Sequence, residues 1–460
     1  MPINKDKLAY SLLLLFMFSF ILIVLKGLVT AQPGDENVYY YMGKLISEGN
    51  VPYRDFFFAH PPLHTYLIAL IYKISGFNII VLKLIPLIST LITAFFIFKI
   101  AKGKFGNLEA LMSSLLFLFS YSVMFNSVFS FGVNLATMFL VVGVYFLFNK
   151  VDYAVSGIFF GLAGVTRLLT LLPISIFLIA ALFSNRKNFL KLLSGFLAIF
   201  VLVNGSFALF FGNDYITPVY KFHLLKSLES AEKINEYSGI IKLNWILFSS
   251  ALLFVFLKDK KQLSTFVIVS FAYLIFLTTL KKIFGFYFII TLPFLALVGG
   301  CSIVHMLKRF DLTKRLKTLI SILLLSIFTW NLVSDILFLE RIGFSGFARG
   351  KELVDFIELN SGKNTQLFGD DSVVPLLALL TNKNIALYFA DTNNQVFISG
   401  AKNLSNVLAG LNGKEVLFVI RSRQGISYFK EVRDFLSRNC EFLSQFHDKL
   451  EGDYLVYRCK

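Results

Sequence analysis

The sequence is poor in the residues that build metal centres and nucleic-acid interfaces. Its 460 residues include 5 His and 3 Cys, which is too few for a metal cluster. Charged residues make up only 16% of the chain, and no basic amphipathic stretch or zinc pattern accompanies the net charge of +16. Internal repeats and low-complexity segments are also lacking. These absences argue against a metalloprotein and against a nucleic-acid-binding protein.

Apolar residues are abundant instead. Hydrophobic residues make up 56% of the chain, 54 residues are Phe, and the mean hydropathy is +0.72. Only a chain solvated by lipid can expose this much apolar surface. The first apolar run, 8–29, is longer than a usual signal-peptide core and many more runs follow it, so we interpret it as a transmembrane helix. The sequence predicts a mainly α-helical, polytopic membrane protein.

Runs of about twenty apolar residues are long enough to span a bilayer. They predict about eleven spans, at 8–29, 80–101, 107–124, 130–149, 152–166, 168–184, 190–211, 239–257, 262–280, 284–306 and 317–338. Within 152–184, a short or broken helix could replace one of the two spans. Together these spans form a membrane domain at 1–340.

The basic residues predict how the chain is oriented. With Lys5 and Lys7 in the cytoplasm, every tight basic cluster among the spans falls on the cytoplasmic side, except Lys281-Lys282. An odd number of spans then places the loop 35–76 and the C-terminal region outside the cell membrane. The predicted localisation is therefore multi-pass in the cell membrane, with a cytoplasmic N-terminus.

After about residue 340, charged and polar residues return and the segments become short. Strands are predicted at 365–370, 385–389, 415–420 and 453–459, and helices at 373–380, 404–411 and 426–439. This alternation predicts a small extracytoplasmic α/β domain at 341–460. A disulfide between Cys440 and Cys459 is chemically permitted in that compartment, and two free thiols are the alternative.

The first external loop contains an acidic pair directly after the first span. Asp35 stands where a helix N-cap belongs, and Gly49 is a natural end for that helix. Pro61-Pro62 fit the first turn of a second helix, 63–75. The loop therefore predicts two interfacial helices. Capping explains Asp35 in structural terms, whereas a carboxylate at a membrane surface that faces a substrate explains it in functional terms.

The loop resembles that of the GT-C class of membrane glycosyltransferases, which includes the protein O-mannosyltransferases and the lipid A aminoarabinose transferases. The matching residues are Asp35, Glu36, Tyr39, Gly49, Pro52-Tyr53, Asp55-Phe56, His60-Pro61-Pro62-Leu63 and Gly76. His60 matches the mannosyltransferase form of the motif. The resemblance continues more weakly through the spans to about residue 300.

This resemblance implies an enzyme that uses a sugar on a polyprenyl or dolichyl phosphate, presented at the outer leaflet. An acceptor hydroxyl attacks the sugar, and the lipid phosphate leaves. Asp35 is then the expected base that activates the hydroxyl, and Glu36 orients the acceptor or the sugar. Tyr39 and Asp55 are expected to bind substrate. The acceptor could be a protein, a lipid or a glycan.

The charge that develops on the leaving phosphate calls for cations. The candidates on the external side are Arg54, His60, Arg167 and Lys281-Lys282. The alternatives are snorkelling for the two lysines and a structural contact with a loop carboxylate for Arg167. Tyr287 matches the family's aromatic residue before a Leu-Pro, although the His that is common just before it is absent.

Three further expectations remain. A divalent cation could bind near Asp35 and Glu36, but these two residues alone do not make a site, so no metal site is predicted. Asp370-Asp371 follow a strand, where they could bind a ligand or cap a helix. His223 is read as a structural residue of an external segment.

Two other functions compete with the enzyme. A flippase or transporter of lipid-linked glycans would need intramembrane charges along a pathway and repeat symmetry, and the sequence shows neither. A non-catalytic scaffold for glycan assembly would be favoured by loss of the acidic pair, which is intact.

Overall fold

The protein forms two compact units in a computed structural model that describes residues 4–227, 230–257, 261–309, 314–422, 424–448 and 452–460. The helical unit comprises Met1–Val29, Lys83–Ser206 and Glu229–Phe344. The mixed unit comprises Thr30–Leu82, Phe207–Leu228 and Ser345–Lys460. The mixed unit therefore combines the first loop with the C-terminal region. The division into domains at 1–340 and 341–460 stays a prediction.

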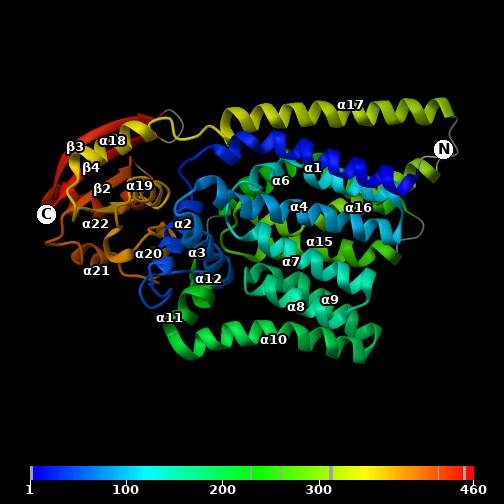
Figure 1. Ribbon diagram of the computed structural model, residues 1–460, viewed down its shortest axis with the longest axis horizontal. Helices are drawn as coiled ribbons and strands as arrows, with labels where there is room; N and C mark the ends of the chain where they lie inside the picture. Colours follow the sequence, from blue (N-terminus) through cyan, green and yellow to red (C-terminus); the bar gives the residue numbers. More distant parts are fainter. Residues whose placement is uncertain (1–3, 228–229, 258–260, 310–313, 423, 449–451) are drawn as a thin grey trace. The chain divides into compact units, whose positions relative to one another are not determined.

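The helical unit is built from long apolar helices (Figure 1). In the described parts of the chain, seven helices are long and apolar enough to cross a membrane. They are α1 (Lys5–Val29), α4 (Ile79–Lys104), α7 (Val133–Tyr145) with its extension η1 (Phe146–Lys150), α10 (Arg186–Phe211), α15 (Lys261–Thr279), α16 (Leu292–Arg309) and α17 (Lys314–Phe338). Figure 1 shows α1, α4, α16 and α17 lying lengthwise, with their axes roughly aligned.

Shorter elements complete this unit. They are α5 (Asn107–Leu118), α6 (Tyr121–Asn126), α8 (Tyr153–Gly164), η2 (Leu168–Thr170), α9 (Leu171–Ser184), α13 (Ser230–Leu243), α14 (Trp245–Leu252), η4 (Leu253–Phe256), η5 (Gly285–Ile290) and η6 (Leu339–Gly343). Each of the eleven predicted spans coincides with apolar helix, which confirms a mainly α-helical bundle. The number of segments that cross the membrane stays a prediction.

One predicted span is bent. The helices on either side of Asn244 meet at 79°, and Asn244 itself has φ −114° and ψ 28°, outside the helical region. Its side-chain oxygen accepts from the Ser122 backbone N–H at 3.0 Å, and its amide donates to the Ser122 hydroxyl at 2.7 Å. The break is thus held by buried hydrogen bonds to the start of α6.

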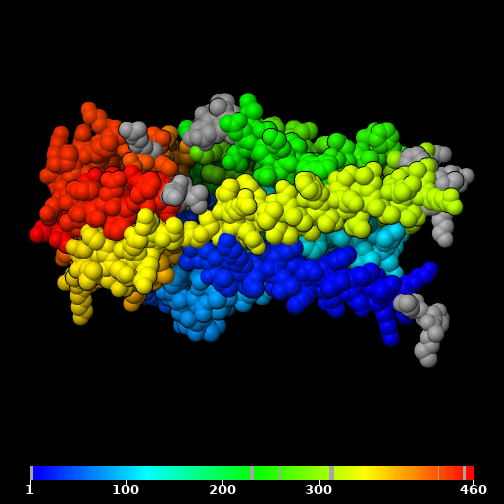
Figure 2. Space-filling view, turned by 90° about the horizontal axis from the view of Figure 1, so that it is seen from above, coloured from blue at the N-terminus to red at the C-terminus, as the bar shows by residue number. Residues whose placement is uncertain are grey.

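Small residues let helices approach closely inside the bundle. A Cβ added at Gly157 would lie 2.2 Å from the Leu192 carbonyl oxygen, and one at Gly195 would lie 2.3 Å from that of Ala154. Only glycine therefore fits where α8 crosses α10. By contrast, α17 exposes apolar side chains such as Leu325 (65%) and Trp330 (80%) along its outer surface (Figure 2). Such a surface suits lipid.

The mixed unit begins with the two predicted loop helices. They are α2 (Glu36–Ser47) and α3 (Leu63–Ser75). Gly76 ends α3 with φ 64°, and Gly49 follows α2 with φ 96°, both in the region that favours glycine. The helix α2 is buried on more than one side, because Tyr40, Tyr41 and Gly43 are buried as well as Val38 and Met42. The reason is that α2 packs between α3 and the C-terminal helix α19 (Val374–Leu380).

The remaining helices of this unit are short. They are α11 (Asn213–Ile216), η3 (Thr217–Lys221), α12 (Phe222–Leu225), α18 (Gly350–Asn360), η7 (Ala386–Tyr388), α20 (Asn394–Ile398), α21 (Leu404–Ala409), η8 (Gly425–Tyr428) and α22 (Lys430–Asn439). The sequence predicts the C-terminal helices α19, α21 and α22 but not α18 or α20. The side chains of α22 and α18 reach the sheet through the ring pairs Phe418–Phe435 and Phe356–Phe446.

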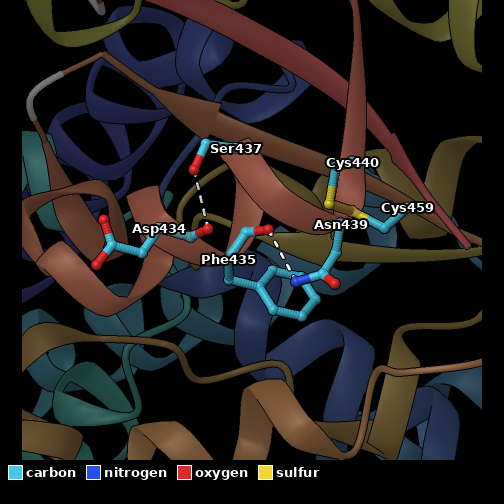
Figure 3. The surroundings of a disulfide bond; sticks show 6 residues. All are labelled: Asp434, Phe435, Ser437, Asn439, Cys440 and Cys459. Carbon is cyan, nitrogen blue, oxygen red and sulfur yellow. Dashed lines mark hydrogen bonds between the residues drawn. A yellow bond between two sulfur atoms is a disulfide. The ribbon is translucent and has the colours of Figure 1, made fainter.

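A four-stranded sheet lies at the centre of the C-terminal region, in the order β1-β2-β4-β3. The strands are β1 (Gln366–Gly369), β2 (Val416–Arg421), β3 (Cys440–Asp448) and β4 (Gly452–Cys459). β1 pairs with β2 in parallel, and the other pairs are antiparallel. Cys440 and Cys459 are direct partners across β3 and β4 and form a disulfide (Figure 3). Of the two alternatives left open by the sequence, the structure has the disulfide.

The predicted strand at 385–389 is wrong, and β3 was not predicted. Ile385 makes one isolated bridge to Leu367, after which Leu387 and Tyr388 adopt φ values of 59° and 52° that extended chain cannot have. β3 escapes detection because its burial does not alternate regularly and a bulge at Phe442–Ser444 shifts its register. The conformation of both segments is therefore decided by tertiary contacts and not by local strand propensity.

Candidate functional site

Asp35 stands at the start of α2, and its side chain makes no capping hydrogen bond. Its position is set by the backbone, since the Gly34 N–H donates to the Ser372 carbonyl at 2.8 Å. Asp152 shows the contrast, because its carboxylate accepts from the Val155 N–H at the start of α8 at 3.1 Å. Capping, which is the structural explanation of Asp35, is therefore not what its carboxylate does.

A small cavity opens beside Asp35. Its walls come from α2, from the aromatic run before α3 and from two C-terminal turns. The lining residues are Asp35, Val38, Tyr39, Met42, Phe58, Ala59, His60, Asp371, Asp391 and Asn393. Three carboxyl groups from segments far apart in the sequence thus face one cavity within the mixed unit.

The two aspartates that follow β1 have different surroundings. Asp370 is fully buried, accepts from the Ser372 N–H at 3.0 Å and pairs with Arg421 at 3.1 Å. Its carboxylate therefore stabilises the turn between β1 and α19. Asp371 is 8% exposed and has no hydrogen bond or ion pair within the described residues. Burial and the repulsion of Asp370, Asp35 and Asp391 hold its pKa well above the ordinary value.

Asp391 is the third carboxyl group of the cavity. Burial, followed by repulsion from Asp35, raises its pKa to about 6, against the opposing effects of the Asn393 N–H and of Lys226. The Asn393 N–H lies 3.4 Å from the Asp391 carboxylate. Lys226 is itself buried and lies over the Phe222 ring at 4.9 Å. The segment 213–227 thus brings a cation towards an acidic cavity.

His60 is held in place by its neighbours in the mixed unit. The Tyr53 hydroxyl donates to the His60 carbonyl at 2.7 Å, and Tyr53 is buried with φ 72°, an unusual value for a tyrosine. The His60 ring stacks on that of His223 at 5.3 Å, and His223 Nε2 lies 2.7 Å from the Ala59 carbonyl oxygen. His223 is therefore structural, as predicted, and it supports a residue of the cavity wall.

The other predicted residues of the first loop are placed less centrally. Tyr39 lines the cavity, with its ring 5.9 Å from that of His60. Glu36 is 1% exposed and does not line the cavity. Arg54 and Asp55 bind each other through two hydrogen bonds of 2.8 and 2.9 Å, and Asp55 also accepts from the Val51 N–H. The guanidinium of Arg54 lowers the pKa of Asp55.

Three of the predicted residues lie together in the helical unit, namely Arg167, Lys282 and Tyr287. We call this group, with the aromatic rings around it, the cation–aromatic corner. The buried Arg167 donates to the Phe131 carbonyl, and the Phe131 ring stacks on Phe286 at 4.6 Å. Lys282 lies over the Phe284 ring at 5.6 Å, and the Tyr287 ring packs against both Phe284 and Phe286. Phe131 therefore connects the two predicted basic positions, and the exposed Lys281 lies next to Lys282.

The described residues contain no group of three or more His, Cys, Asp or Glu side chains arranged to hold a metal ion. Asp391 and Lys226 were missed by the sequence analysis. Each is a charged residue in a short segment, and no spacing or motif marks it. Asp371 was noticed at a strand-to-helix turn, but its role could not be separated from that of Asp370.

Comparison with known proteins agrees with this geometry. Residues 59–206 match a family model described as dolichyl-phosphate-mannose-protein mannosyltransferase, which covers about a third of the chain. No curated protein matches the sequence significantly.

Solved structures of similar fold cover nearly the whole chain. ArnT from Cupriavidus metallidurans in the apo state has a TM-score of 0.68 at 14% identity, with 98% of each chain covered. The same protein bound to undecaprenyl phosphate has a TM-score of 0.62 at 13% identity, with 96% of this chain and 97% of ArnT covered. The oligosaccharyltransferase AglB from Archaeoglobus fulgidus, in complex with an inhibitory peptide and a dolichol-phosphate, has a TM-score of 0.60 at 10% identity, with 98% of this chain and 74% of AglB covered.

These likenesses show an ArnT-like fold. The resemblance to the GT-C class of membrane glycosyltransferases, predicted from the first loop, is confirmed. The match of a mannosyltransferase family model and the apolar helices together support a multi-pass membrane protein of the glycosyltransferase kind.

Proposed function

We propose that the protein is an integral membrane glycosyltransferase that moves a sugar from a polyprenyl-phosphate or dolichyl-phosphate donor to an acceptor hydroxyl, with Asp35 as the base. The observation that carries this proposal is the position of Asp35, whose carboxylate lines a cavity and does not cap α2. The family match and the fold support the class of reaction, and two neighbours of that fold bind undecaprenyl phosphate or dolichol-phosphate.

In the proposed reaction, Asp35 takes the proton of the acceptor hydroxyl as the hydroxyl oxygen bonds to the anomeric carbon of the sugar. The bond between that carbon and the phosphate oxygen breaks, and its electron pair leaves with the lipid phosphate. Positioned general bases contribute about 10²–10⁴-fold to such steps. Glu36 lies on the same turn of α2 and is proposed to orient Asp35 or the sugar, while Tyr39 and His60 contact substrate from the cavity wall.

The donor phosphate is proposed to bind the cation–aromatic corner of the helical unit. Arg167 offers a planar fork for two phosphate oxygens, and Lys281, Lys282 and Tyr287 add two charges and a hydroxyl. Aromatic rings around them exclude water, which strengthens the attraction to the leaving phosphate. Arg54 and Asp55 are proposed to contact substrate at the rim of the first loop.

Transfer is proposed to occur on the outer face of the cell membrane, with the N-terminus in the cytoplasm. The disulfide between Cys440 and Cys459 supports this orientation, because such bonds persist in oxidising compartments. The basic clusters between the spans support the same orientation.

The test is transfer of radiolabelled sugar from polyprenyl-phosphate donors in membranes that contain the wild type, Asp35→Asn or Asp152→Asn. Asp35→Asn keeps the size of the side chain and removes the base, so we expect transfer to fall about 10²–10⁴-fold. Asp152→Asn alters an aspartate that does cap a helix, and we expect near wild-type transfer. Equal transfer by wild type and Asp35→Asn would exclude Asp35 as the base, and no transfer from any donor would favour a transporter or a scaffold.

A further inference from the structure

The cavity beside Asp35 contains a carboxyl group that the proposed reaction does not use. Asp371 is 8% exposed, lines the cavity, and has neither a hydrogen bond nor an ion pair within the described residues. A buried carboxyl group without a partner is costly, because it loses its hydration and gains nothing in return. Its neighbour Asp370 shows that this turn can satisfy a carboxylate fully. The exception at Asp371 therefore points to a partner that enters the cavity.

The surroundings of Asp371 define what that partner can be. The acidic groups that face it are Asp35, Asp370 and Asp391, while Arg421 is held by Asp370 and Lys226 acts on Asp391. His60 also lines the cavity. Burial and the like charges close by raise the pKa of Asp371 and so favour its protonated form, which can donate a hydrogen bond where a carboxylate cannot.

The lining of the cavity narrows the choice of partner further. Rings of Tyr39, Phe58 and His60 provide flat apolar walls, while carboxyl groups provide hydrogen-bond acceptors and one donor. A sugar unit has both an apolar face and several hydroxyl groups, so its chemistry matches both parts of the lining.

Two other kinds of acceptor fit less well. A phosphorylated acceptor would bring negative charge against Asp35 and Asp391. An extended peptide usually binds by pairing with a free strand edge, but the outer edge of β1, which leads into Asp371, is already covered because the Leu367 N–H donates to the Asn384 carbonyl at 2.8 Å.

We propose that this cavity is the acceptor subsite, that it takes an uncharged sugar unit, and that Asp371 binds a hydroxyl group of that unit as a hydrogen-bond donor. This proposal rests on the proposed function, because it identifies the molecule whose hydroxyl Asp35 activates. It adds a specificity residue from the C-terminal region to a reaction whose proposed base comes from the first loop.

The test uses two probes as acceptors, octyl β-D-glucopyranoside and its 6-phosphate, with the full-length protein in lipid nanodiscs. We expect wild type to prefer the neutral glycoside by at least about tenfold in kcat/KM. Asp371→Ala should raise the KM for the glycoside about tenfold and leave the KM for the donor unchanged. Asp371→Asn keeps a hydrogen-bond donor and should stay within about threefold of wild type at neutral pH.

A pH profile separates binding by Asp371 from a merely structural role. In wild type the KM for the glycoside should rise at alkaline pH, because ionised Asp371 cannot donate and repels Asp35. In Asp371→Asn this rise should be absent. Thermal unfolding of each variant shows whether it is folded. If Asp371→Ala is unfolded, the pH profile of Asp371→Asn still tests whether Asp371 binds the glycoside.

The outcomes distinguish the two proposals. If wild type transfers sugar to neither probe nor to a Thr-containing peptide from any lipid-phosphate donor, the proposed function fails. If wild type does transfer sugar but prefers the 6-phosphate or the peptide, the proposed acceptor is wrong. An unchanged KM for the glycoside in Asp371→Ala, or an alkaline rise that persists in Asp371→Asn, would remove Asp371 from the acceptor subsite.

Discussion

The acidic cavity of the mixed unit and the cation–aromatic corner of the helical unit have opposite chemistry. The cavity gathers Asp35, Asp371 and Asp391, and burial together with repulsion from Asp35 raises the pKa values of the last two. The corner gathers Arg167 and Lys282 among Phe and Tyr rings. A carboxylate cavity suits the removal of a proton from a neutral hydroxyl, whereas a basic corner suits an anionic phosphate. On the basis of this charge, the proposed acceptor is assigned to the cavity and the proposed donor to the corner.

The two regions also differ in how they are assembled. The corner consists of residues on or between membrane helices, so the helical bundle itself sets their spacing. The cavity combines segments that begin more than 300 residues apart, and only the fold of the mixed unit brings them together. Changes to the mixed unit should therefore affect the acceptor, and changes to the corner should affect the donor.

The largest expected effect on stability comes from the disulfide. Replacing both Cys440 and Cys459 by Ser releases a loop with a sequence separation of 19 residues, which should reduce the stability of the sheet by about 3 kcal/mol. Hydrogen exchange of the β2 and β4 peptides, followed by mass spectrometry, measures this loss. Acceptor KM should rise with it while donor KM stays constant.

The molecule provides its own control for this experiment. Its two tryptophans, Trp245 and Trp330, both lie in the helical unit. Their fluorescence should therefore follow the same unfolding curve in wild type and in the double variant. If the unfolding curve of the tryptophan signal shifts together with that of the sheet, the two units do not unfold independently. The loss of stability could then not be assigned to the mixed unit.

The next effect concerns the corner. Arg167→Gln removes a charge-assisted contact to the donor phosphate, so donor KM should rise about 10–100-fold with little change in acceptor KM. Steady-state kinetics with a polyprenyl-phosphate sugar at varied concentrations measures it. Lys187→Gln changes an exposed cation at the start of α10 and should leave donor KM unchanged. A higher acceptor KM with unchanged donor KM in Arg167→Gln would reverse the assignment of the two regions.

The smallest expected effect is the pH dependence contributed by Asp391. Its pKa is about 6 in the folded protein and 3.8 ordinarily, so the native state binds more protons between these values. Its contribution to stability is therefore present below pH 3.8 and is lost as the pH rises through 6. Asp391→Asn removes the ionised group, and the variant should gain stability relative to wild type at pH 8 but little at pH 4.

Hydrogen exchange of the mixed unit at both pH values measures this difference. Asp355→Asn, which changes an exposed aspartate on α18, provides the control and should show no such pH-dependent gain. A gain for Asp391→Asn that is equal at pH 4 and pH 8 would mean that Asp391 does not titrate near neutral pH.

Much of the membrane fold and of the first loop follows from the sequence. Local patterns suffice there, because the length of an apolar run predicts a helix in lipid and a proline or glycine marks where it begins or ends. This is why α3 has the predicted bounds Leu63–Ser75. The C-terminal region is predicted less well. Its strands are short, and segments such as 385–389 satisfy strand propensity but meet positive φ values in the fold.

The sequence by itself determined the mainly helical, multi-pass membrane character of the chain and the positions of its apolar helices, since these depend on composition and on local order along the chain. Its first loop also singled out Asp35 as a candidate residue. Only the tertiary structure decided which carboxyl groups surround Asp35. Asp370 and Asp371 are adjacent and chemically identical, yet one is bonded to Arg421 and the other faces the cavity. The physical reason is that burial and partners, not residue type, set the charge state of a carboxyl group, and these are properties of the folded chain.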